Sequence, residues 1–527
     1  MAAVNSCFWQ RKRGSEDKTI WFDLRSRKGN MEQLSPARLP FVGDLKAFDY
    51  ALQVCVELVR RWPVRKVLVC LVLICAALSL VSVSGASTVT VLYTFTGSNG
   101  ANPVADLVQD SGGNIWGTTE NGGTGSCPNG CGTIFELTKA SGFTSPGYLY
   151  SFQGGSGDGA YPASGLIFDK KVGPSGTLFG TTSSGGGSGC GGSGCGTIFS
   201  FPVGGSNDTV LYSFAGGSDG ATPLAELLLA TSDKKVLLYG TTSAGGGSGC
   251  GGSGCGTVFA FQLGDAADNV LYRFTGGSDG ANPVAALVFD SSGKNPNLWG
   301  TAENGGVGYG TIFELTASSG YTELVVGYSF LGVDELDGAT PEAALTFDSS
   351  ADLLYGTTGY GGDAPSCSLA AGCGTVFQFQ LPQSPSSYSN FYSFTGLGAG
   401  SSGAVPTARL ALETKHNAEE GYVYGTASQG GIDSGSCPAE GCGTAFAICP
   451  PTVCDSGAKE YTLFSFDFTH GANPAAGMLL NLPKLGDRGR ERDFSPPGGK
   501  GDCTSNCSGA ASSGGSDPSG VIYVLTD

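Results

Sequence analysis

One pattern recurs seven times after residue 87 of this 527-residue chain, and it limits the possible folds more than any other feature. A clear copy runs from Val270 to Thr316. Each copy carries a step of the Gly-Ala-x-Pro type, and successive prolines are 58 to 68 residues apart. A period of this length is typical of a repeat architecture in which each copy forms one structural unit. The repeated prolines are Pro103, Pro162, Pro223, Pro283, Pro341, Pro406 and Pro474.

Each copy contains four short apolar runs, which we interpret as β-strands. The runs are rich in Tyr, Phe, Val, Ile and Thr, and Gly, Asp, Ser or Pro bounds each of them. No segment of the copies shows the 3.6-residue period of an amphipathic helix. Four strands per copy and seven copies predict an all-β, seven-bladed propeller of four-stranded blades. A parallel β-helix is the competing repeat fold, but its coils are much shorter. Examples of the four runs are Leu211–Phe214, Ala286–Asp290, Leu298–Thr301 and Gly310–Leu315.

The order of the runs suggests how the ring closes. Leu92–Phe95 precedes the first proline, and the chain ends on Val521–Thr526, which resembles the third strand of a blade. We therefore expect residues 87–527 to form the propeller, with the N-terminal strand completing the last blade so that no edge stays open. The second strand of that blade has no recognisable copy. An irregular insertion, 482–519, rich in Gly, Ser, Pro and charge, stands in its place.

A separate N-terminal region precedes the repeats. Residues 1–66 hold 13 Lys and Arg against 7 Asp and Glu, a net charge of +6, whereas 67–86 are uncharged and apolar. A basic flank, an apolar stretch and small residues up to Ala86 predict a signal peptide or a membrane anchor helix. The basic side would stay in the cytoplasm and the repeats would be exported. Residues 1–66 are either a largely disordered cytoplasmic extension or the product of a start assigned too early.

Most cysteines occur in close pairs. Four of the 18 precede residue 87, and the other 14 form seven pairs. Five pairs lie just before a Gly-Thr strand, while the fourth copy lacks both members and has Gly308-Tyr309 there. The two cysteines of a pair are present together or absent together, which predicts that they form a disulfide. Disulfides agree with export of the protein. Two cysteines without a nearby histidine are too few ligands for zinc. The pairs are Cys127/Cys131, Cys190/Cys195, Cys250/Cys255, Cys367/Cys373, Cys437/Cys442, Cys449/Cys454 and Cys503/Cys507.

Four aspartates at equivalent positions are the candidate ligand-binding residues. They precede glycine in the loop before each proline, on the end of the ring that also carries the cysteine loops. A ring of carboxylates there could bind a cation or a sugar, but Asp-Gly is also a favoured tight-turn pair. Asn99, Ser402 and His470 replace aspartate in the other copies, which favours the turn. The candidates are Asp158, Asp219, Asp279 and Asp337.

Composition argues against several function classes. The 15 basic and 38 acidic residues of 87–527 give a net charge of −23, which excludes nucleic acid as a partner. The chain has two histidines, His416 and His470, and neither belongs to a recognisable catalytic motif. We therefore expect no cofactor and no enzymatic activity. The alternative is a carbohydrate-active propeller enzyme, a glycoside hydrolase or a lyase, because ring closure can bring remote acids together.

The repeat resembles a known bacterial family. The Leu-Tyr-x-Phe-x-Gly-Gly-Ser-Asp-Gly-Ala run, the proline, Leu-Tyr-Gly-Thr-Thr and Gly-Thr-Val-Phe are similar to the GloVer tandem repeat of choice-of-anchor surface proteins. The resemblance covers about 87–480 and implies an exported protein held at the cell surface by an anchor that varies among members. It carries no established activity. We therefore expect a secreted or surface-bound binding module for an extracellular glycan or protein, with 67–86 contacting the membrane if it is not cleaved.

Overall fold

The computed structural model describes residues 7–8, 21–22 and 88–526, apart from gaps within the last range. These gaps are 233–234, 292–294, 334–335, 363–366, 368, 383–386, 397–400, 414–420, 432–436, 438–439, 452–457, 480–506 and 512–518. The expected disordered segment and helix within 1–86 lie outside the described residues, except for a two-residue pairing of β1 (Cys7–Phe8) with β2 (Trp21–Phe22). Among the described residues, no helix has the length and apolar character needed to cross a membrane.

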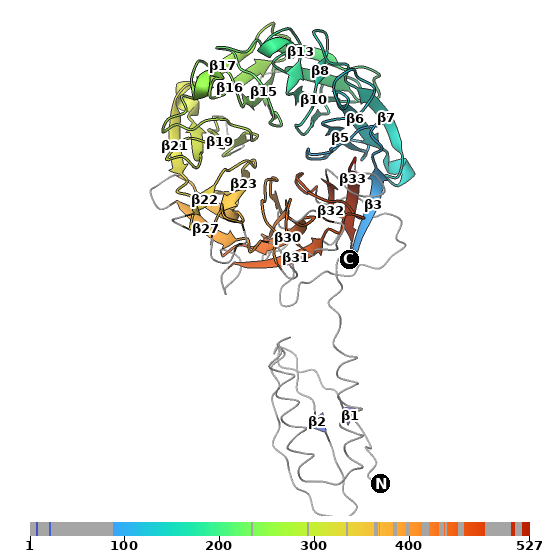
Figure 1. The fold of residues 1–527 in the computed structure, drawn as a ribbon, viewed down its shortest axis with the longest axis vertical. Coiled ribbons are helices and arrows are strands. Elements are labelled where there is room, and N and C mark those ends of the chain that lie inside the picture. The colour runs from blue at the N-terminus through green and yellow to red at the C-terminus, as the bar shows by residue number, and fades with distance from the viewer. Residues whose placement is uncertain are drawn as a thin grey trace, which may run out of the picture. The chain divides into compact units, whose positions relative to one another are not determined.

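Seven antiparallel sheets form a ring in the compact unit Gly85–Asp527 (Figure 1). We number them as blades in chain order. Blade 1 contains β4 (Val108–Gln109), β5 (Ile115–Thr119), β6 (Thr133–Leu137) and β7 (Pro146–Ser151). Blade 2 contains β9 (Ile167–Asp169), β10 (Thr177–Thr182), β12 (Thr197–Pro202) and β13 (Thr209–Ser213). Blade 3 contains β14 (Leu228–Ser232), β15 (Lys235–Thr242), β16 (Thr257–Gln262) and β17 (Asn269–Arg273).

The next three blades repeat the same four-stranded order. Blade 4 contains β18 (Val288–Phe289), β19 (Leu298–Ala302), β20 (Thr311–Leu315) and β21 (Leu324–Ser329). Blade 5 contains β23 (Thr346–Asp348), β24 (Leu353–Thr358), β26 (Thr375–Gln380) and β27 (Tyr388–Ser393). Blade 6 contains β28 (Ala411–Leu412), β29 (Val423–Ala427), β30 (Thr444–Cys449) and β31 (Lys459–Ser465). The prediction of a seven-bladed, all-β propeller is confirmed.

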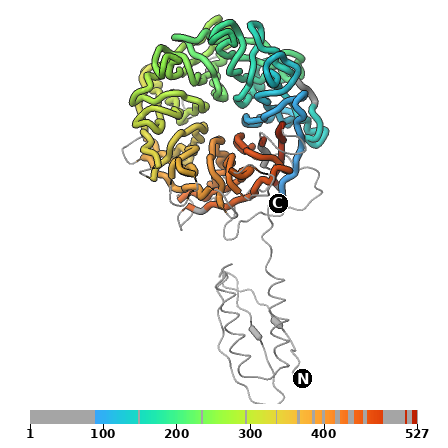
Figure 2. Tube along the Cα trace, viewed as in Figure 1, coloured from blue at the N-terminus to red at the C-terminus, as the bar shows by residue number. Residues whose placement is uncertain are grey.

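Blade 7 draws its strands from both ends of the described propeller. Its order is β3 (Thr88–Thr94), β33 (Val521–Thr526) and β32 (Cys507–Ala511), and β3 pairs with β33 from Thr88↔Thr526 to Thr94↔Val521. Figure 2 shows the blue start of the propeller beside its red end.

The strand β32 corrects one expectation, because it lies inside the 482–519 segment that the sequence indicated to be irregular. Its Cys-Ser-Gly-Ala-Ala sequence takes the place of Leu-aromatic-Gly-Thr-Thr in the other copies. Gly509 is paired with Tyr523, just as Gly117 is paired with Phe135 in blade 1. The glycine of the repeat is therefore kept at this position. The rest of β32 lacks the aromatic residue by which the second strands of the other blades are recognised, but it still pairs with β33.

Short elements complete the fold at the ends of the blades. Two pairs of two-residue strands link neighbouring loops, and the helical turns are single 3₁₀ turns. The paired strands are β8 (Gly159–Ala160) with β11 (Ser184–Gly185) and β22 (Gly338–Ala339) with β25 (Tyr360–Gly361). The turns are η2 (Lys139–Ser141), η3 (Cys190–Gly192), η4 (Cys250–Gly252) and η5 (Ala317–Ser319).

Aromatic side chains join neighbouring blades. The Phe of each Leu-Tyr-x-Phe run, or its equivalent, packs edge-on against the aromatic residue of the third strand in the next blade. Ring centroids lie 5.0 to 5.4 Å apart at these contacts. T-shaped pairs of this kind add to the free energy of area burial. The contacts are Phe95–Phe135, Phe152–Phe199, Phe214–Phe259, Phe274–Phe313, Phe330–Phe377, Phe394–Phe446 and Phe466–Tyr523.

The repeated proline and glycine meet at the same interfaces. A Cβ at Gly196 would lie 2.5 Å from Pro223 Cδ of the next copy, and one at Gly520 would lie 2.5 Å from Pro103 Cδ. Both glycines have φ near +100°, a region that other residues rarely enter. Beside each contact, a main-chain hydrogen bond joins the two copies, as from Thr222 N to Cys195 O at 2.8 Å. Close backbone packing therefore requires glycine at this step of the repeat.

Candidate functional site

The disulfide loops lie at one end of the ring. Five disulfides are formed, each in the loop between the second and third strands of its blade. The prediction is confirmed for these five pairs. Cys449 is also disulfide-bonded, whereas Cys454 and Cys503 lie outside the described residues. The five are Cys127–Cys131, Cys190–Cys195, Cys250–Cys255, Cys367–Cys373 and Cys437–Cys442.

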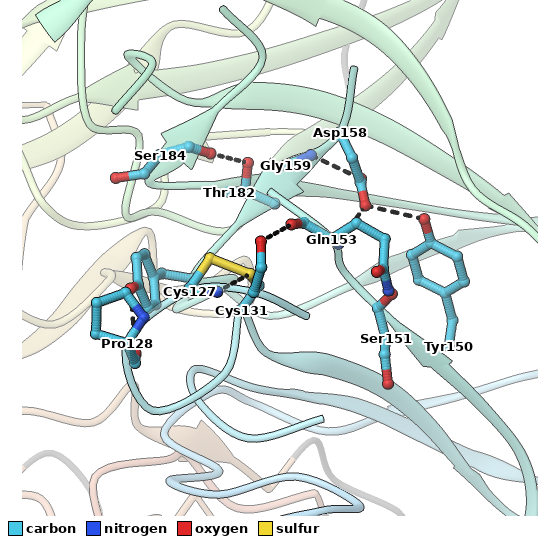
Figure 3. Close-up of a disulfide and its surroundings, with 12 residues drawn as sticks. Cys127, Pro128, Cys131, Tyr150, Ser151, Gln153, Asp158, Gly159, Thr182 and Ser184 are labelled. Atoms are coloured by element: carbon cyan, nitrogen blue, oxygen red, sulfur yellow. Dashed lines mark hydrogen bonds between the residues drawn. A yellow bond between two sulfur atoms is a disulfide. The ribbon is translucent and has the colours of Figure 1, made fainter. Parts of the chain in front are cut away.

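The loops that carry the candidate aspartates lie beside these disulfides, as expected. Figure 3 shows Asp158 near the Cys127–Cys131 loop, with the Tyr150 hydroxyl and the Gln153 amide pointing at its carboxylate. A side chain at Gly154 would meet Cys127 Sγ at 2.9 Å. The glycine therefore lets the aspartate loop pack directly on the disulfide.

Each candidate aspartate is bonded within its own loop. Asp158 Oδ2 accepts hydrogen bonds from Tyr150 Oη at 3.1 Å and from Gln153 N at 2.6 Å. The other three aspartates also each accept from one tyrosine hydroxyl, at 2.8 to 3.0 Å, and one main-chain amide, at 2.7 to 2.8 Å. These bonds support the turn interpretation. Among the described residues, no group of three His, Cys, Asp or Glu side chains is placed to hold a metal ion. The other aspartates are Asp219, Asp279 and Asp337.

A second acid joins two of these aspartates from the neighbouring blade. Burial raises the pKa of Asp208 to about 6, and the Asp158 charge raises it further against the opposing hydrogen bond from Tyr150. Asp268 repeats the arrangement with Asp219 and Tyr212, and its pKa is also raised to about 6. Asp208 immediately precedes β13, the fourth strand of blade 2, and Asp268 immediately precedes β17, the fourth strand of blade 3. Acids at the blade interface were not among the sequence candidates, although Asn-Asp-Thr-Val-Leu-Tyr and Asp-Asn-Val-Leu-Tyr hold them at one repeat position.

The channel along the ring axis is the second site that the sequence did not predict. The first strand of each blade follows the proline and lies on the inner side, as β23 lies inside β27 in Figure 1. The three residues after each of the first six prolines, together with Ala475 of the seventh copy, line a channel cavity of about 100 Å³. Most of these residues are small or apolar, including the alanine at the second position of six copies. A narrow channel of this kind holds water-sized groups unless the ring opens.

Four charged residues interrupt that apolar lining, and all of them except Glu342 share one repeat position. Asp106, Glu226 and Arg409 occupy the third position after the proline in three different copies, where the other copies have Gly or Ala. They border both the channel cavity and an adjoining cavity of about 160 Å³. An alignment of the seven copies on the repeated proline reveals these three residues, because no other copy has a charged residue at the third position after it.

The charged side chains contact one another across the ring. Arg409 Nη1 lies 3.0 Å from Glu226 Oε2, so an ion pair joins blade 3 to blade 6. A Cβ at Gly165 would lie 3.4 Å from both Asp106 Cβ and Glu226 Cδ, so both acids lie beside that glycine. The main-chain amide of Gly477 donates to Asp106 Oδ1 at 2.5 Å. We call Asp106, Glu226 and Arg409 the channel triad.

Burial and charge set the protonation of the channel acids. Burial raises the pKa of Glu226 to about 6 against the opposing effect of the Arg409 guanidinium, and Asp106 raises it further. Glu342, also in the channel lining, has its pKa raised to about 7 by burial and by the Glu303 charge. Both acids can therefore exchange a proton close to neutral pH. The triad can hold a water-sized group, and Glu226 can exchange a proton with it.

The fold and the cysteine-bearing loops define a propeller built from sequence repeats, in which disulfides cross-link the loops. The family model of the Gloeobacter/Verrucomicrobia repeat matches residues 79–253 and 191–437, so the chain belongs to that repeat family. This confirms the resemblance. No curated protein matches the chain.

Several solved structures resemble the chain at low identity. An α-L-arabinofuranosidase of Fusarium graminearum is 12% identical with a TM-score of 0.41, covering 72% of this chain and 99% of its own. The GH74 enzyme of Niastella koreensis is 14% identical with a TM-score of 0.38, covering 68% of this chain and 45% of its own. An α-L-arabinanase of Penicillium chrysogenum is 11% identical with a TM-score of 0.38, covering 72% and 98%.

These likenesses assign no activity to the chain, but they correct one expectation. The scarcity of histidine and arginine led us to expect no enzymatic activity. Glycoside hydrolases are among the solved structures that match, so the expectation is not confirmed. Scarcity of histidine is in any case a weak argument against an enzyme, because an acid with a raised pKa needs no histidine to donate a proton.

Proposed function

We propose that this protein is exported and acts at the cell surface or in the surroundings as a binding module, with its ligand, a glycan or a protein, engaged at the disulfide-bearing end. The observation that carries the proposal is the placement of five disulfides in equivalent loops at that end. Disulfides persist in oxidising compartments and are rare in the cytosol. The apolar segment 67–86 and its basic flank support export.

The disulfide loops are suited to presenting a surface of constant shape. The loops are rich in glycine, which on its own leaves the backbone mobile. The disulfide and the tyrosine–aspartate bonds restrain them from two sides. A restrained loop loses less conformational entropy on binding, which favours affinity.

Cell fractionation with thiol labelling tests the location. We expect the native organism to place the protein outside the cytoplasm, with the ten cysteines of the five pairs blocked to alkylation until a reductant is added. N-terminal sequencing of that protein shows whether 67–86 is removed. A cytoplasmic protein with freely alkylated cysteines would contradict the proposal.

We also propose that β3 closes the ring. The pairing of β3 with β33, the Phe95–Phe135 contact and the Gly520–Pro103 approach support it. A closed ring leaves no sheet edge between its first and last blades for another chain to pair with.

The channel triad favours a second candidate, a carbohydrate-active enzyme. Hydrolysis of a glycosidic bond requires two carboxyl groups, one of them protonated at the working pH. Asp106 and Glu226 are two such groups, and Glu226 has a raised pKa. The test combines glycan-array binding with reducing-sugar release for wild type, Glu226→Gln and, as a control at an exposed acid, Glu323→Gln. Turnover lost in Glu226→Gln alone supports the enzyme, whereas binding without turnover supports the module.

A further inference from the structure

Two of the seven blade interfaces contain a pair of carboxyl groups in contact. Asp158 follows β7 of blade 1, and Asp208 precedes β13 of blade 2, yet the two side chains lie within hydrogen-bonding reach of each other. Asp219 and Asp268 repeat the arrangement between blades 2 and 3. Two ionised carboxylates at such close range repel each other, so each pair needs a physical account.

The hydrogen-bond donors around the first pair serve one acid better than the other. Asp158 Oδ1 accepts a hydrogen bond from Gly159 N at 2.6 Å, and its Oδ2 accepts from Tyr150 and Gln153 (Figure 3). Asp208 Oδ2, in contrast, is buried and has no hydrogen-bond partner among the residues that the structure describes. The single proton of the Tyr150 hydroxyl cannot be donated to both acids at once.

The second pair shows the same shortage of donors. Asp219 Oδ2 accepts from Tyr212 Oη at 2.9 Å and from Ala215 N at 2.7 Å. Asp268 Oδ2 is buried without a hydrogen-bond partner in the described part of the chain. A buried oxygen without a donor is unfavourable. A proton on Asp268 removes this cost, because the carboxyl O–H can donate to the neighbouring carboxylate.

The groups that act on Asp208 carry no positive charge. They are the Tyr150 hydroxyl, the Asp158 carboxylate and the main chain of Asp208 itself. Burial is the largest effect, and together with the Asp158 charge it raises the pKa of Asp208 to about 6, against the hydrogen bond from Tyr150. The folded ring therefore favours a proton held between the two carboxyl groups, which titrate as a unit.

The second pair has a cation nearby. Arg273 Nε donates to Ser218 O at 2.8 Å, next to Asp219 in the chain. The groups that act on Asp268 are nonetheless Asp219, Tyr212 and its own main chain, and burial again has the largest effect. Blade 2 has a serine in place of this arginine, so the first pair gives the simpler test.

Other interfaces show which residues can replace the second acid. The position four residues before the repeated tyrosine holds Leu324 in blade 4, where the matching residues of blade 3 are Tyr272 and Asp279. In blade 5 the same position holds Tyr388, which stacks on Tyr328 of blade 4 with ring centroids 3.9 Å apart. Packing at this position can therefore be achieved without a carboxyl group.

We propose that each carboxyl pair shares one proton and acts as a pH-sensitive clasp between neighbouring blades, closed while the proton is held and loosened when it leaves. We call the pairs Asp158–Asp208 and Asp219–Asp268 the carboxyl clasps. When the proton leaves, two negative charges remain in contact across the interface. The inference goes beyond the proposed function, because it concerns how the ring is held together and not what it binds.

The first clasp controls a loop at the disulfide-bearing end of the ring. Loop 152–158, between β7 and β8, ends on Asp158 and packs through Gly154 on the disulfide of blade 1. Its hydrogen bond from Gln153 N to Asp158 Oδ2 depends on the position of that carboxylate. Repulsion from an ionised Asp208 therefore shifts the loop toward open conformations.

Hydrogen exchange of the purified full chain, measured by mass spectrometry with a chelator present, tests the proposal. Rates at about pH 5 and pH 7 are each divided by the intrinsic exchange rate at that pH. If opening returns Asp208 to its ordinary pKa of 3.8, the opening constant of loop 152–158 should rise about tenfold over this range. The equivalent loop 274–278, whose interface has Leu324 in place of the second acid, should not change.

Asp208→Asn is the matched variant, because its amide can donate to Asp158 at any pH as the protonated acid does. Loop 152–158 should then be protected equally at both pH values, and at about pH 7 at least as well as in wild type. Loop 214–218 should keep its own pH response, since the second clasp is intact. Asp265→Asn, at an exposed position, should behave like wild type.

Four outcomes would overturn the proposal. Loops 152–158 and 274–278 could respond equally to pH, Asp208→Asn could keep the wild-type response, or that variant could lose protection at both pH values. In the fourth, replacing the chelator by about 1 mM calcium restores protection at neutral pH, which assigns a bridging cation to the pair in place of a proton. Asp268→Asn repeats the measurement on loop 214–218, so misfolding of one variant does not decide the result.

Discussion

Each residue of a Gly-Thr-Thr run in this repeat has a separate structural task. In blade 1, a Cβ at Gly117 would lie 2.6 Å from Phe135 Cζ, so glycine is needed to seat the ring. Thr118 donates across the blade interface to Ser164 O at 2.9 Å. Thr119 shares a hydrogen bond of 2.8 Å with Thr133 on the next strand of its own blade. One three-residue motif thus serves the core, the neighbouring blade and the sheet.

A methyl group at this glycine tests the packing. In blade 2, Gly180→Ala would place a Cβ 2.7 Å from Phe199 Cζ, and we expect the free energy of unfolding to fall by about 1 to 3 kcal/mol. Urea unfolding measures it. Gly157→Ala, where nothing lies within 4 Å and φ is not positive, is the control and should change stability little. Equal effects of both substitutions would contradict this role of the glycine.

The buried acids predict how stability depends on pH. The pKa of Asp208 and Asp268 is raised from 3.8 to about 6, and that of Glu460 from 4.5 to about 7, with burial as the main cause in each. The folded protein therefore binds these protons more tightly than the unfolded chain does. Stability should be highest below pH 4 for these groups and fall as pH rises to about 7.

Neutral variants give the matched measurement. Asp208→Asn should flatten the fall in unfolding free energy between about pH 4 and pH 6, whereas Asp265→Asn at an exposed loop position should leave it unchanged. Denaturant titrations at several pH values provide the comparison. A wild-type curve that rises across this range would show that other groups dominate.

At the scale of elements, the loops differ more between copies than the strands do. Five blades close the loop between their second and third strands with a disulfide, while blade 4 packs Tyr309 on Gly332. The strand β32 shows the converse, since it pairs in register with β33 although it keeps little of the repeat beyond Gly509. Pairing between strands tolerates a change of side chains, because the hydrogen bonds between strands are made by main-chain atoms.

Removing one disulfide tests how much these loops contribute. Cys190 and Cys195 are five residues apart, and closing so short a loop is worth about 2 kcal/mol by chain entropy. We expect Cys190→Ser with Cys195→Ser to lower the free energy of unfolding by about that amount. Hydrogen exchange should become faster in the loop between β10 and β12 and stay unchanged in the equivalent loop of blade 3. Loss of the whole fold would contradict this local role.

At the scale of the molecule, the same contacts recur at each of the seven interfaces. Phe95 from the N-terminal strand meets Phe135 at 5.1 Å, the same separation as Phe214 and Phe259 within the chain. The Phe95–Phe135 contact therefore has the same geometry as a contact between two blades within the chain.

Equal interfaces should be equally important for stability. Phe95→Ala and Phe214→Ala should each lower the free energy of unfolding by about 3 to 5 kcal/mol, because each removes a buried aromatic ring from a blade interface. Differential scanning calorimetry of the two variants compares them. A much smaller loss for Phe95→Ala would show that β3 contributes little to the closed ring.

Local signals in the sequence were enough to predict the all-β class, the seven copies and the partners in the five disulfides between Cys127 and Cys442. Strand residues, turn residues and paired cysteines are local signals, and a sevenfold repeat multiplies them. Only the tertiary structure brought Asp106, Glu226 and Arg409 into one channel, because they lie in three copies and meet only when the ring forms. The aspartates were visible in the sequence, but their bonds to tyrosine were not.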